Sequence, residues 1–429
     1  MKSSRDDART ETWTTLTSGR PCLLLIAPNN SYRIAPYIKA ATQLNLNTLI
    51  VSDSSHSLVI EVAAGLQADF SNEQAAVDKI YKTARQLNIA GVIATDDYTV
   101  EIAAQVASRL QLPHNPVKGM KTARWKHHAR QVLQQAGLQV PIHRCIQLNV
   151  PLEAQIDDFP FPCVVKPVNL SGSKGVIRAN NVEEFLKACE RIRLIVADQP
   201  SLEARQTLLV ESYIPGIEVA VEGILEKGSF TALAIFDKPD PLEGPYFEET
   251  YYITPSRLPS GQQQQLIRCV ADACNAYGLV TGPVHAELRI NDDAIYILEV
   301  AARTIGGECA RLLVYGTGYS LEELVISNAI GDAVTPQAFQ QSAGVLMIPT
   351  PKAGILRRIE GIMAAQKIPY IDAINISIRD GHELKCLPEG ASYLGFIFAS
   401  GPNPDVVEAA LREAHQKLNI VVAPLWKIN

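Results

Sequence analysis

Short apolar runs alternate with helically spaced apolar positions along the first quarter of the chain. The runs at 22–27, 48–51 and 91–94 have the length of buried strands. The segment after the third run places apolar residues on one face of a helix, at Val100, Ala103, Ala104, Ala107 and Leu110. Strands that alternate with helices predict a βαβ unit with a parallel sheet.

Polar residues follow two of these strands. The segment 28–31 comes after the first strand and 95–97 after the third. Because open α/β sheets bind ligands at the carboxyl ends of their strands, these loops are either substrate-facing or ordinary turns. No GxGxxG motif follows the first strand, which argues against a dinucleotide site.

Two prolines in the segment 112–116 mark a first boundary. The helix that follows carries Ala129, Val132 and Leu133 on its apolar face and ends at Gly137. We therefore expect a new domain to begin near residue 119.

The remaining chain shows three further patterns. Strands with few helices between them are predicted from 161 to 301, and helices from 310 to 330. Runs at 344–348 and 393–398 predict strands in the last section. That section closes with a helix whose apolar residues are Val406, Val407, Ala410, Leu411 and Ala414.

These boundaries divide the chain into four sections. They are a flexible tail at 1–20, a βαβ domain at 21–118, a central domain at 119–335 with a flexible lobe at about 125–205, and a C-terminal domain at 336–429.

The composition is that of a soluble globular protein, with 47% apolar and 20% charged residues in 429. A formal charge of −6 argues against nucleic acid as the main partner. The polar start lacks the apolar core of a signal peptide, and no run approaches the roughly 20 apolar residues of a membrane span. Eight cysteines without a CxxC pair predict reduced thiols and a cytoplasmic protein.

A lysine ends a predicted buried strand in the central section. Lys166 lies near the end of the run 161–167, just before Pro167, and a Ser/Gly-rich loop follows at 169–175. Glycines allow backbone N–H groups to approach an anion, so this arrangement can hold a polyphosphate. A lysine that extends to solvent beside a hairpin loop gives the same pattern.

A Pro-Gly bend joins two further strands. Pro215 and Gly216 lie between the runs 208–214 and 217–221. Such a hinge can present backbone donors and acceptors to an adenine edge, with Glu218 accepting from ribose hydroxyls. The alternative is an ordinary hairpin.

Two consecutive predicted strands each carry an acid. Glu287 and Glu299 lie in apolar surroundings, and the turn 291–293 separates their strands. Buried carboxylates require a cation, and hard oxygen ligands suit Mg²⁺. A salt bridge to Arg303 or Arg289 is the alternative.

Taken in order, these motifs resemble those of the ATP-grasp superfamily. The motifs are the lysine-bearing helix start 125–130, Val165-Lys166-Pro167, the loop 169–175, the hinge 211–218 and the stretch from Glu287 to Arg303. The resemblance covers roughly 121–330. It implies an α/β and α+β protein with an N-terminal parallel βαβ domain, a central two-lobed ATP-grasp domain and a C-terminal α+β domain.

The resemblance also implies a role for each motif residue. Lys126 and Lys166 would contact the ATP phosphates, under a flap that includes Ser171, Gly172 and Ser173. Adenine would be lined by Glu211, Tyr213 and Ile214, and Glu218 would bind ribose. Glu287 and Glu299 would hold Mg²⁺, or alternatively Mn²⁺, and Arg303 would face the reacting acyl phosphate. The superfamily often has Asn two residues after the second glutamate, where this chain has Ala301. The departure leaves the number of metal ions open.

Within the superfamily, the stretches 282–287 and 299–303 look like those of the dipeptide-forming L-amino acid ligases. This resemblance implies an ADP-forming carbon–nitrogen ligase that activates a carboxylic acid and couples it to an amine, both small molecules. His285, Glu248, Glu249 and Arg257 are candidate substrate residues, although the segment 247–250 is equally typical of a solvated loop. A homodimer is common among such relatives.

Other readings remain open. A carboxylase or purine-pathway enzyme would activate bicarbonate or formate at a similar site. A nucleotide-binding regulator without activity would have lost the acids or Arg303, and both are present. A structural or scaffold protein is a third alternative.

Overall fold

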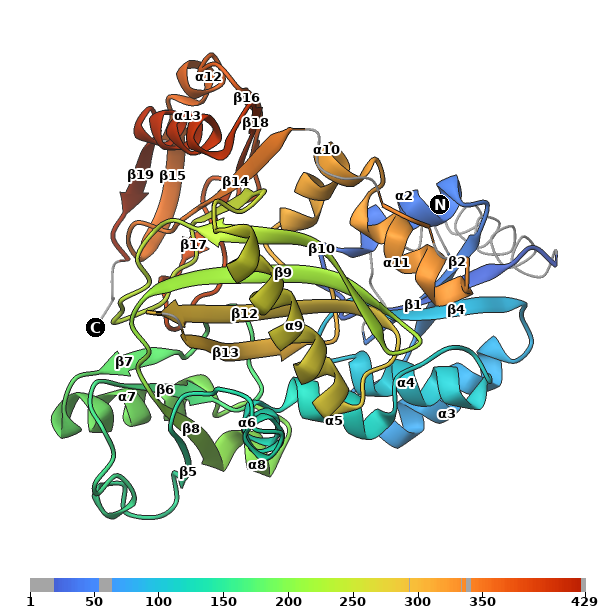
Figure 1. The fold of residues 1–429 in the computed structure, drawn as a ribbon, viewed down its shortest axis with the longest axis horizontal. Coiled ribbons are helices and arrows are strands. Elements are labelled where there is room, and N and C mark those ends of the chain that lie inside the picture. The colour runs from blue at the N-terminus through green and yellow to red at the C-terminus, as the bar shows by residue number, and fades with distance from the viewer. Residues whose placement is uncertain (1–18, 54–63, 293, 333, 337–340, 426–429) are drawn as a thin grey trace.

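The computed structural model describes residues 19–53, 64–292, 294–332, 334–336 and 341–425. The predicted flexible tail lies outside this range except for its last two residues. Figure 1 shows an N-terminal domain at one side, a small lobe below, and the C-terminal section above a long central sheet. Among the described residues, no helix is long and apolar enough to cross a membrane.

The N-terminal domain confirms the predicted parallel sheet. Its four strands run in the order β3-β2-β1-β4, and their bounds are β1 Cys22–Ile26, β2 Asn47–Ser52, β3 Ala64–Gln67 and β4 Ile89–Ala94. The helices are α2 Ile34–Gln43, α3 Glu73–Ala84 and α4 Val100–Arg109. The sheet is buried on both faces, because alternate residues of β1 join different apolar clusters. This burial explains why the strand runs are continuously apolar.

Two helices lead into the small lobe. They are α5 Val117–Arg124 and α6 Lys126–Gln135, and Trp125 forms the break between them. After α6 the chain turns at Gly137, whose φ of 75° is one that glycine adopts without strain. The predicted end of this helix is therefore confirmed.

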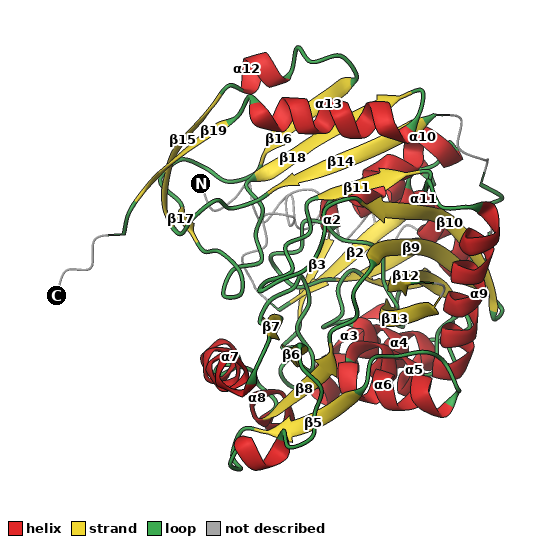
Figure 2. Ribbon diagram, turned by 60° about the vertical axis from the view of Figure 1, so that its left-hand side comes forward, coloured by secondary structure: helices red, strands yellow, loops and turns green. Residues whose placement is uncertain are grey.

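The lobe is an antiparallel sheet in the order β5-β8-β6-β7. Its elements are β5 His143–Gln147, η2 Glu153–Gln155, β6 Cys163–Pro167, β7 Ile177–Ala179, α7 Val182–Ile195, α8 Leu202–Gln206 and β8 Thr207–Ser212. Side chains such as Val165, Phe185 and Val210 form a separate apolar core. Figure 2 shows this lobe standing apart from the large sheet.

Eight strands form the large sheet in the order β13-β12-β9-β10-β11-β14-β18-β16. They are β9 Ile217–Glu226, β10 Ser229–Lys238, β11 Tyr251–Thr254, β12 Gly282–Asn291, β13 Ala294–Ala301, β14 Ser342–Ile348, β16 Ile371–Ile376 and β18 Gly395–Gly401. Since β11 pairs with β14, the sheet continues across the domain boundary predicted at 335/336. The central and C-terminal sections therefore share one sheet.

Helices cover this sheet. They are α9 Ser260–Tyr277 on β13, β9 and β10, η3 Cys309–Leu313, α10 Val314–Thr317 and α11 Leu321–Ile330 toward the N-terminal domain, and α13 Pro404–Gln416 on β14 and β18. A second small sheet, β17-β15-β19, is built from β15 Gly354–Glu360, β17 Glu383–Leu384 and β19 Asn419–Ala423, with α12 Ile362–Ala365 nearby. The long helices α7 and α9 fall in the segment that the apolar pattern predicts as mainly strands.

Candidate active site

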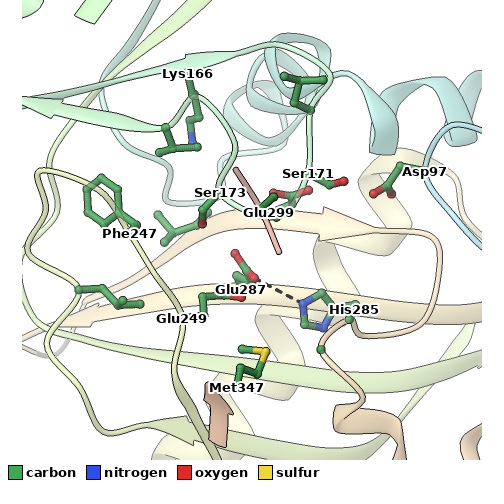
Figure 3. Close-up of a pocket in the computed structure, with 18 of the residues that line it drawn as sticks. Asp97, Lys166, Ser171, Ser173, Phe247, Glu249, His285, Glu287, Glu299 and Met347 are labelled. Carbon is green, nitrogen blue, oxygen red and sulfur yellow. Dashed lines mark ion pairs between the residues drawn. The ribbon is translucent and has the colours of Figure 1, made fainter. Parts of the chain in front are cut away.

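A cleft of about 640 Å³ lies between the N-terminal domain, the small lobe, the large sheet and the C-terminal section. Its lining includes Arg33 of the N-terminal domain, Lys166 of the lobe, Glu287 of the large sheet and Tyr393 of the C-terminal section. Figure 3 shows side chains from opposite sides pointing into this space. The fold thus brings together groups that are far apart in the sequence.

The lobe contributes a buried cluster of charges. The ammonium of Lys166 and the guanidinium of Arg130 both bind the carboxylate of Glu211. Burial alone would raise the pKa of Glu211, but the two cations outweigh it and lower the pKa to about 2. Burial also lowers the pKa of Lys166. The carboxylate therefore fixes Lys166 at the strand end, facing the cleft.

The Ser/Gly-rich loop also lines the cleft. Ser171, Gly172 and Ser173 are lining residues, and Gly172 and Ser173 have φ values of 64° and 55°. Two consecutive residues in the left-handed region turn the backbone sharply, which favours glycine at 172. The loop therefore lines the same cleft as Lys126 and Lys166.

Glu287 and Glu299 occupy facing positions of neighbouring strands. They are direct partners in the antiparallel β12–β13 ladder, so both side chains leave the same face of the sheet. Lys126 Nζ lies 2.7 Å from Glu299 Oε2, and Lys238 Nζ lies 3.4 Å from Glu287 Oε1. The acids thus pair with lysines rather than with the arginines considered from the sequence, and Glu287 also pairs with His285.

Lys238 lies among three carboxylates. Its Nζ is 2.8 Å from Glu218 Oε1 and 2.5 Å from Glu249 Oε1, in addition to its contact with Glu287. Oxygens of Glu218, Glu249 and Glu287 lie within 4.8 Å of one another. Burial raises the pKa of Glu249 to about 7, although Lys238 opposes the shift. Such a set of hard oxygen ligands fits a divalent cation.

Of the two predicted metal ligands, Glu287 belongs to this carboxylate cluster and Glu299 lies beside Lys126. Glu218, the predicted ribose ligand, also accepts a hydrogen bond of 2.9 Å from Arg289 Nε. All three acids line the cleft. Lys238 was missed, although it ends an apolar strand in the same way as Lys166.

His285 connects the cluster to the protein interior. Its Nδ1 is 3.2 Å from Glu222 Oε2 and its Nε2 is 3.5 Å from Glu287 Oε1, the pair drawn in Figure 3. Burial lowers the pKa of this imidazole, but the two carboxylates outweigh burial and raise it to about 9. Glu222 also accepts the backbone N–H of Ile305. The imidazole therefore orients the Glu287 carboxylate.

Arg303 reaches the cleft from the turn after β13. Its Nε donates a 2.9 Å hydrogen bond to Asp97 Oδ2, and Asp97 raises the pKa of Arg303 despite burial. Asp97 lies in the loop after β4, which the sequence left open between a turn and a substrate-facing loop. Loop residues of the N-terminal domain that line the cleft are Asn30, Ser31, Tyr32, Arg33, Asp96 and Asp97.

The predicted adenine hinge forms one wall of the cleft. Tyr213 and Ile214 line it, and the rings of Tyr213 and Phe247 stack with centroids 6.4 Å apart. Gly216 has a φ of 102°, and a Cβ there would meet the carbonyl oxygen of Ile290 at 2.0 Å. The glycine is thus required for the close approach of the hinge to β12.

Two predicted substrate residues lie elsewhere in the described structure. Arg257 does not line the cleft, because its guanidinium pairs with Asp237 at 2.9 Å and with Glu408 at 2.7 Å. Glu248 also lies outside the lining, whereas its neighbour Glu249 points into it. Of the four candidate substrate residues, His285 and Glu249 therefore line this cleft, and Arg257 and Glu248 do not.

The C-terminal section contributes a wall that motif reading did not find. Its lining residues are Met347, Ser377, Ile378, Ala391, Ser392, Tyr393 and Phe396. They are mostly apolar or uncharged, and no chemical motif distinguishes them in the sequence. Only the shared sheet brings them to the cleft.

Comparisons with known proteins agree with this architecture. Residues 159–311 match the ATP-grasp domain, and residues 346–423 match the L-amino acid ligase C-terminal domain 2. A crystal structure of L-amino acid ligase from Bacillus licheniformis superposes with a TM-score of 0.83 at 26% identity, covering 95% of this chain and 100% of that one.

Two curated relatives have lower coverage or identity. The uncharacterized protein y4rH of Sinorhizobium fredii is 22% identical over 94% of this chain and 83% of its own length. Alanine–anticapsin ligase of Bacillus subtilis is 25% identical over 54% of this chain, which spans about half (52%) of that relative. The chain thus contains an ATP-grasp domain and, in its last section, a C-terminal domain of the L-amino acid ligase type.

Proposed function

We propose that this protein is an ADP-forming ligase that activates a small carboxylic acid, an amino acid, as its acyl phosphate and couples it to an amine. One observation is the main support. Lysines from the lobe, paired acids from the large sheet and Arg303 from the following turn converge on one cleft. This is the set of charges that phosphoryl transfer followed by acyl transfer requires.

The two lysines and the flap have the binding role in this proposal. Lys126 and Lys166 are buried cations that line the cleft, and each is fixed by a carboxylate, Lys126 by Glu299 and Lys166 by Glu211. Fixed cations offset the negative charge of a triphosphate without reorganising during the reaction. The loop of Ser171 to Ser173 would exclude water from the activated acid.

The carboxylates fit Mg²⁺ or another hard divalent ion. Glu287 would hold it, with Glu218 or Glu249 of the same carboxylate cluster, or Glu299, which also lines the cleft, as further ligands. The ion would supply positive charge at the transferred phosphate oxygens. Lys238 neutralises the cluster when no ion is bound there.

Arg303 has the role of stabilising charge at the acyl carbon. The carboxylate of the acid substrate attacks the γ-phosphorus and ADP leaves. The amine then attacks the acyl carbon, its proton is lost, and phosphate leaves. Asp97 orients Arg303 toward the cleft, where a guanidinium donor stabilises the oxyanion of the second step.

Among the alternatives, the match of 346–423 to an L-amino acid ligase domain supports amino acids over bicarbonate or formate. Three superposed structures, of a phosphoribosylglycinamide synthetase, an N5-carboxyaminoimidazole ribonucleotide synthetase and a biotin carboxylase domain, share 17%, 14% and 18% identity and so indicate the fold alone. The presence of Lys166, Glu287 and Arg303 in one cleft argues against an inactive regulator.

The test is a screen of acid and amine pairs with ATP and Mg²⁺, followed by measurement of ADP and phosphate. Hydroxylamine added in place of the amine should trap the acyl phosphate as a hydroxamate. The screen includes bicarbonate and formate as acids, because turnover with these would indicate a carboxylase or purine-pathway enzyme instead. Release of AMP and pyrophosphate, or no nucleotide turnover with any pair, would contradict the proposal.

A further inference from the structure

Two histidines and a glutamate meet outside the cleft, at the junction of the lobe with the preceding helices. His127 and His128 lie in the first turn of α6, and Glu203 lies in α8. His127 Nε2 is 3.0 Å from Glu203 Oε1, and His128 Nε2 is 3.9 Å from the same oxygen. None of the three lines the cleft described above.

The spacing of these atoms is that of a metal coordination shell. The three ligand atoms lie within 4.8 Å of one another. Zinc bonds to nitrogen and oxygen of about 2.0–2.2 Å place neighbouring ligand atoms roughly 3–4 Å apart. If the 3.9 Å distance between His128 Nε2 and Glu203 Oε1 shortened slightly, these atoms and His127 Nε2 could bind one ion. Its fourth coordination position would be open to water.

Packing holds the two imidazoles in place. The ring of His127 meets Trp125 edge-on at 5.8 Å, and the two histidine rings are 4.1 Å apart. The His127 side chain is only 12% exposed, and within the described part of the chain its buried Nδ1 has no hydrogen-bond partner. The ring is thus oriented by packing and by Glu203 alone, with Nε2 directed at the carboxylate.

We propose that His127, His128 and Glu203 form a site for a borderline transition-metal cation of the Zn²⁺ class, separate from the carboxylate cluster in the cleft. Two imidazoles and one carboxylate suit such ions, whereas Mg²⁺ prefers oxygen alone. The bound ion would tie α6 to α8. Since Lys126 begins α6 and its backbone N–H donates to Val168 of the lobe, the ion would also fix the lobe beside this lysine.

A simple hydrogen bond between His127 and Glu203 is the competing explanation, and it requires no ion. The two explanations differ at His128, which is too far from Glu203 for a hydrogen bond at 3.9 Å but is a ligand in the metal site. Substitution of His128 therefore distinguishes them.

The experiment uses the untagged full chain, stripped of metal and titrated with Zn²⁺ against a chromogenic chelator in excess Mg²⁺. We expect one Zn²⁺ per chain and a higher Tm with Zn²⁺. His127→Gln, His128→Gln and Glu203→Gln should each weaken binding by at least about tenfold, since loss of even an outer partner costs that much. Each should also abolish the rise in Tm.

Two control variants complete the test. His382→Gln changes an exposed histidine far along the chain and should leave Zn²⁺ binding unchanged. Glu287→Gln removes an acid of the cleft and should also leave it unchanged. Binding that survives His128→Gln, or that is lost only in Glu287→Gln, would overturn the proposal. Unchanged Tm of the metal-free variants shows that they fold.

Discussion

Arg191 of α7 forms a two-point ion pair with Glu389, which lies in the segment between β17 and β18. Its Nε is 2.5 Å from Glu389 Oε1 and its Nη2 is 2.8 Å from Oε2. Beside this pair, the N–H of Gly175 donates to the carbonyl of Pro388 at 2.9 Å. The lobe that carries the flap is thereby joined to the C-terminal section.

The first prediction concerns this link. Glu389→Gln should raise the KM for ATP and increase ATP hydrolysis without product, because a loosened lobe admits water. Both side chains are at least 40% exposed, so the change in unfolding free energy should stay within about 1 kcal/mol. Hydrogen exchange of α7 would report the loosening directly.

Arg191→Lys is the matched variant for this link. It keeps the charge but loses the paired geometry, and we expect an intermediate effect. If the wild type, Glu389→Gln and Arg191→Lys have the same KM for ATP and form the same amount of product per ATP hydrolysed, the ion pair has no part in closing the lobe over the cleft.

A second prediction concerns Lys166. Lys166→Ala should reduce phosphate release below detection while the fold persists, since Glu211 keeps its contact with Arg130. Lys187→Ala, at an exposed lysine on α7, is the control and should have normal activity. Near-normal turnover of Lys166→Ala at saturating ATP would exclude phosphate binding by this lysine.

The third prediction concerns pH. Glu211 has a folded pKa of about 2, below its ordinary 4.5, so its stabilising effect is present above pH 4.5 and is lost as the pH falls toward 2. The shift corresponds to a stabilisation on the order of 3 kcal/mol. Glu211→Gln should therefore lower Tm most at neutral pH, where it also leaves two buried cations unpaired.

The difference in Tm between wild type and Glu211→Gln should shrink between pH 4.5 and 2, because other carboxyl groups titrate equally in both proteins. A difference that stays constant over this range would mean that Arg130 and Lys166 do not hold Glu211 ionised.

The motifs on the strands could be predicted from the sequence, because the residues of each motif lie close together along the chain. Glu287 and Glu299 lie in adjacent strands joined by a short turn, and the structure pairs them directly. Lys238 was missed because its approach to Glu287 depends on β10 lying next but one to β12 in the sheet, with β9 between them. Such long-range order leaves no signal in residue spacing.

Arg257 illustrates the opposite error. An arginine in a loop near predicted acids suggests a substrate ligand, but its partners Asp405 and Glu408 come from a helix about 150 residues away in the sequence. Only the packing of α13 beside the large sheet creates that contact. Charge type alone therefore could not separate a surface ion-pair network from a binding site.

A fourth prediction concerns the metal. EDTA should abolish ADP formation, and Glu287→Gln or Glu299→Gln should raise the Mg²⁺ concentration needed for half-maximal rate, because each removes a negative charge near the ion. Glu360→Gln, at a surface acid bound to Arg358, is the control. Activity that persists in EDTA would instead mean that Glu299 and Glu287 only pair with Lys126 and Lys238 and hold no metal ion.

The last prediction separates the two chemical steps by means of Arg303. Arg303→Ala should lower amide formation by about 10²–10³, the loss expected for one oxyanion donor. Positional isotope exchange in ATP, measured with the acid but without the amine, reports acyl phosphate formation alone and should fall much less. Asp97→Asn keeps the guanidinium but loosens its orientation, because Asp97 accepts from Nε, and should cause a smaller loss of the same kind. Equal losses in exchange and in amide formation would move Arg303 to the phosphoryl transfer, and no loss in either would remove it from the reaction.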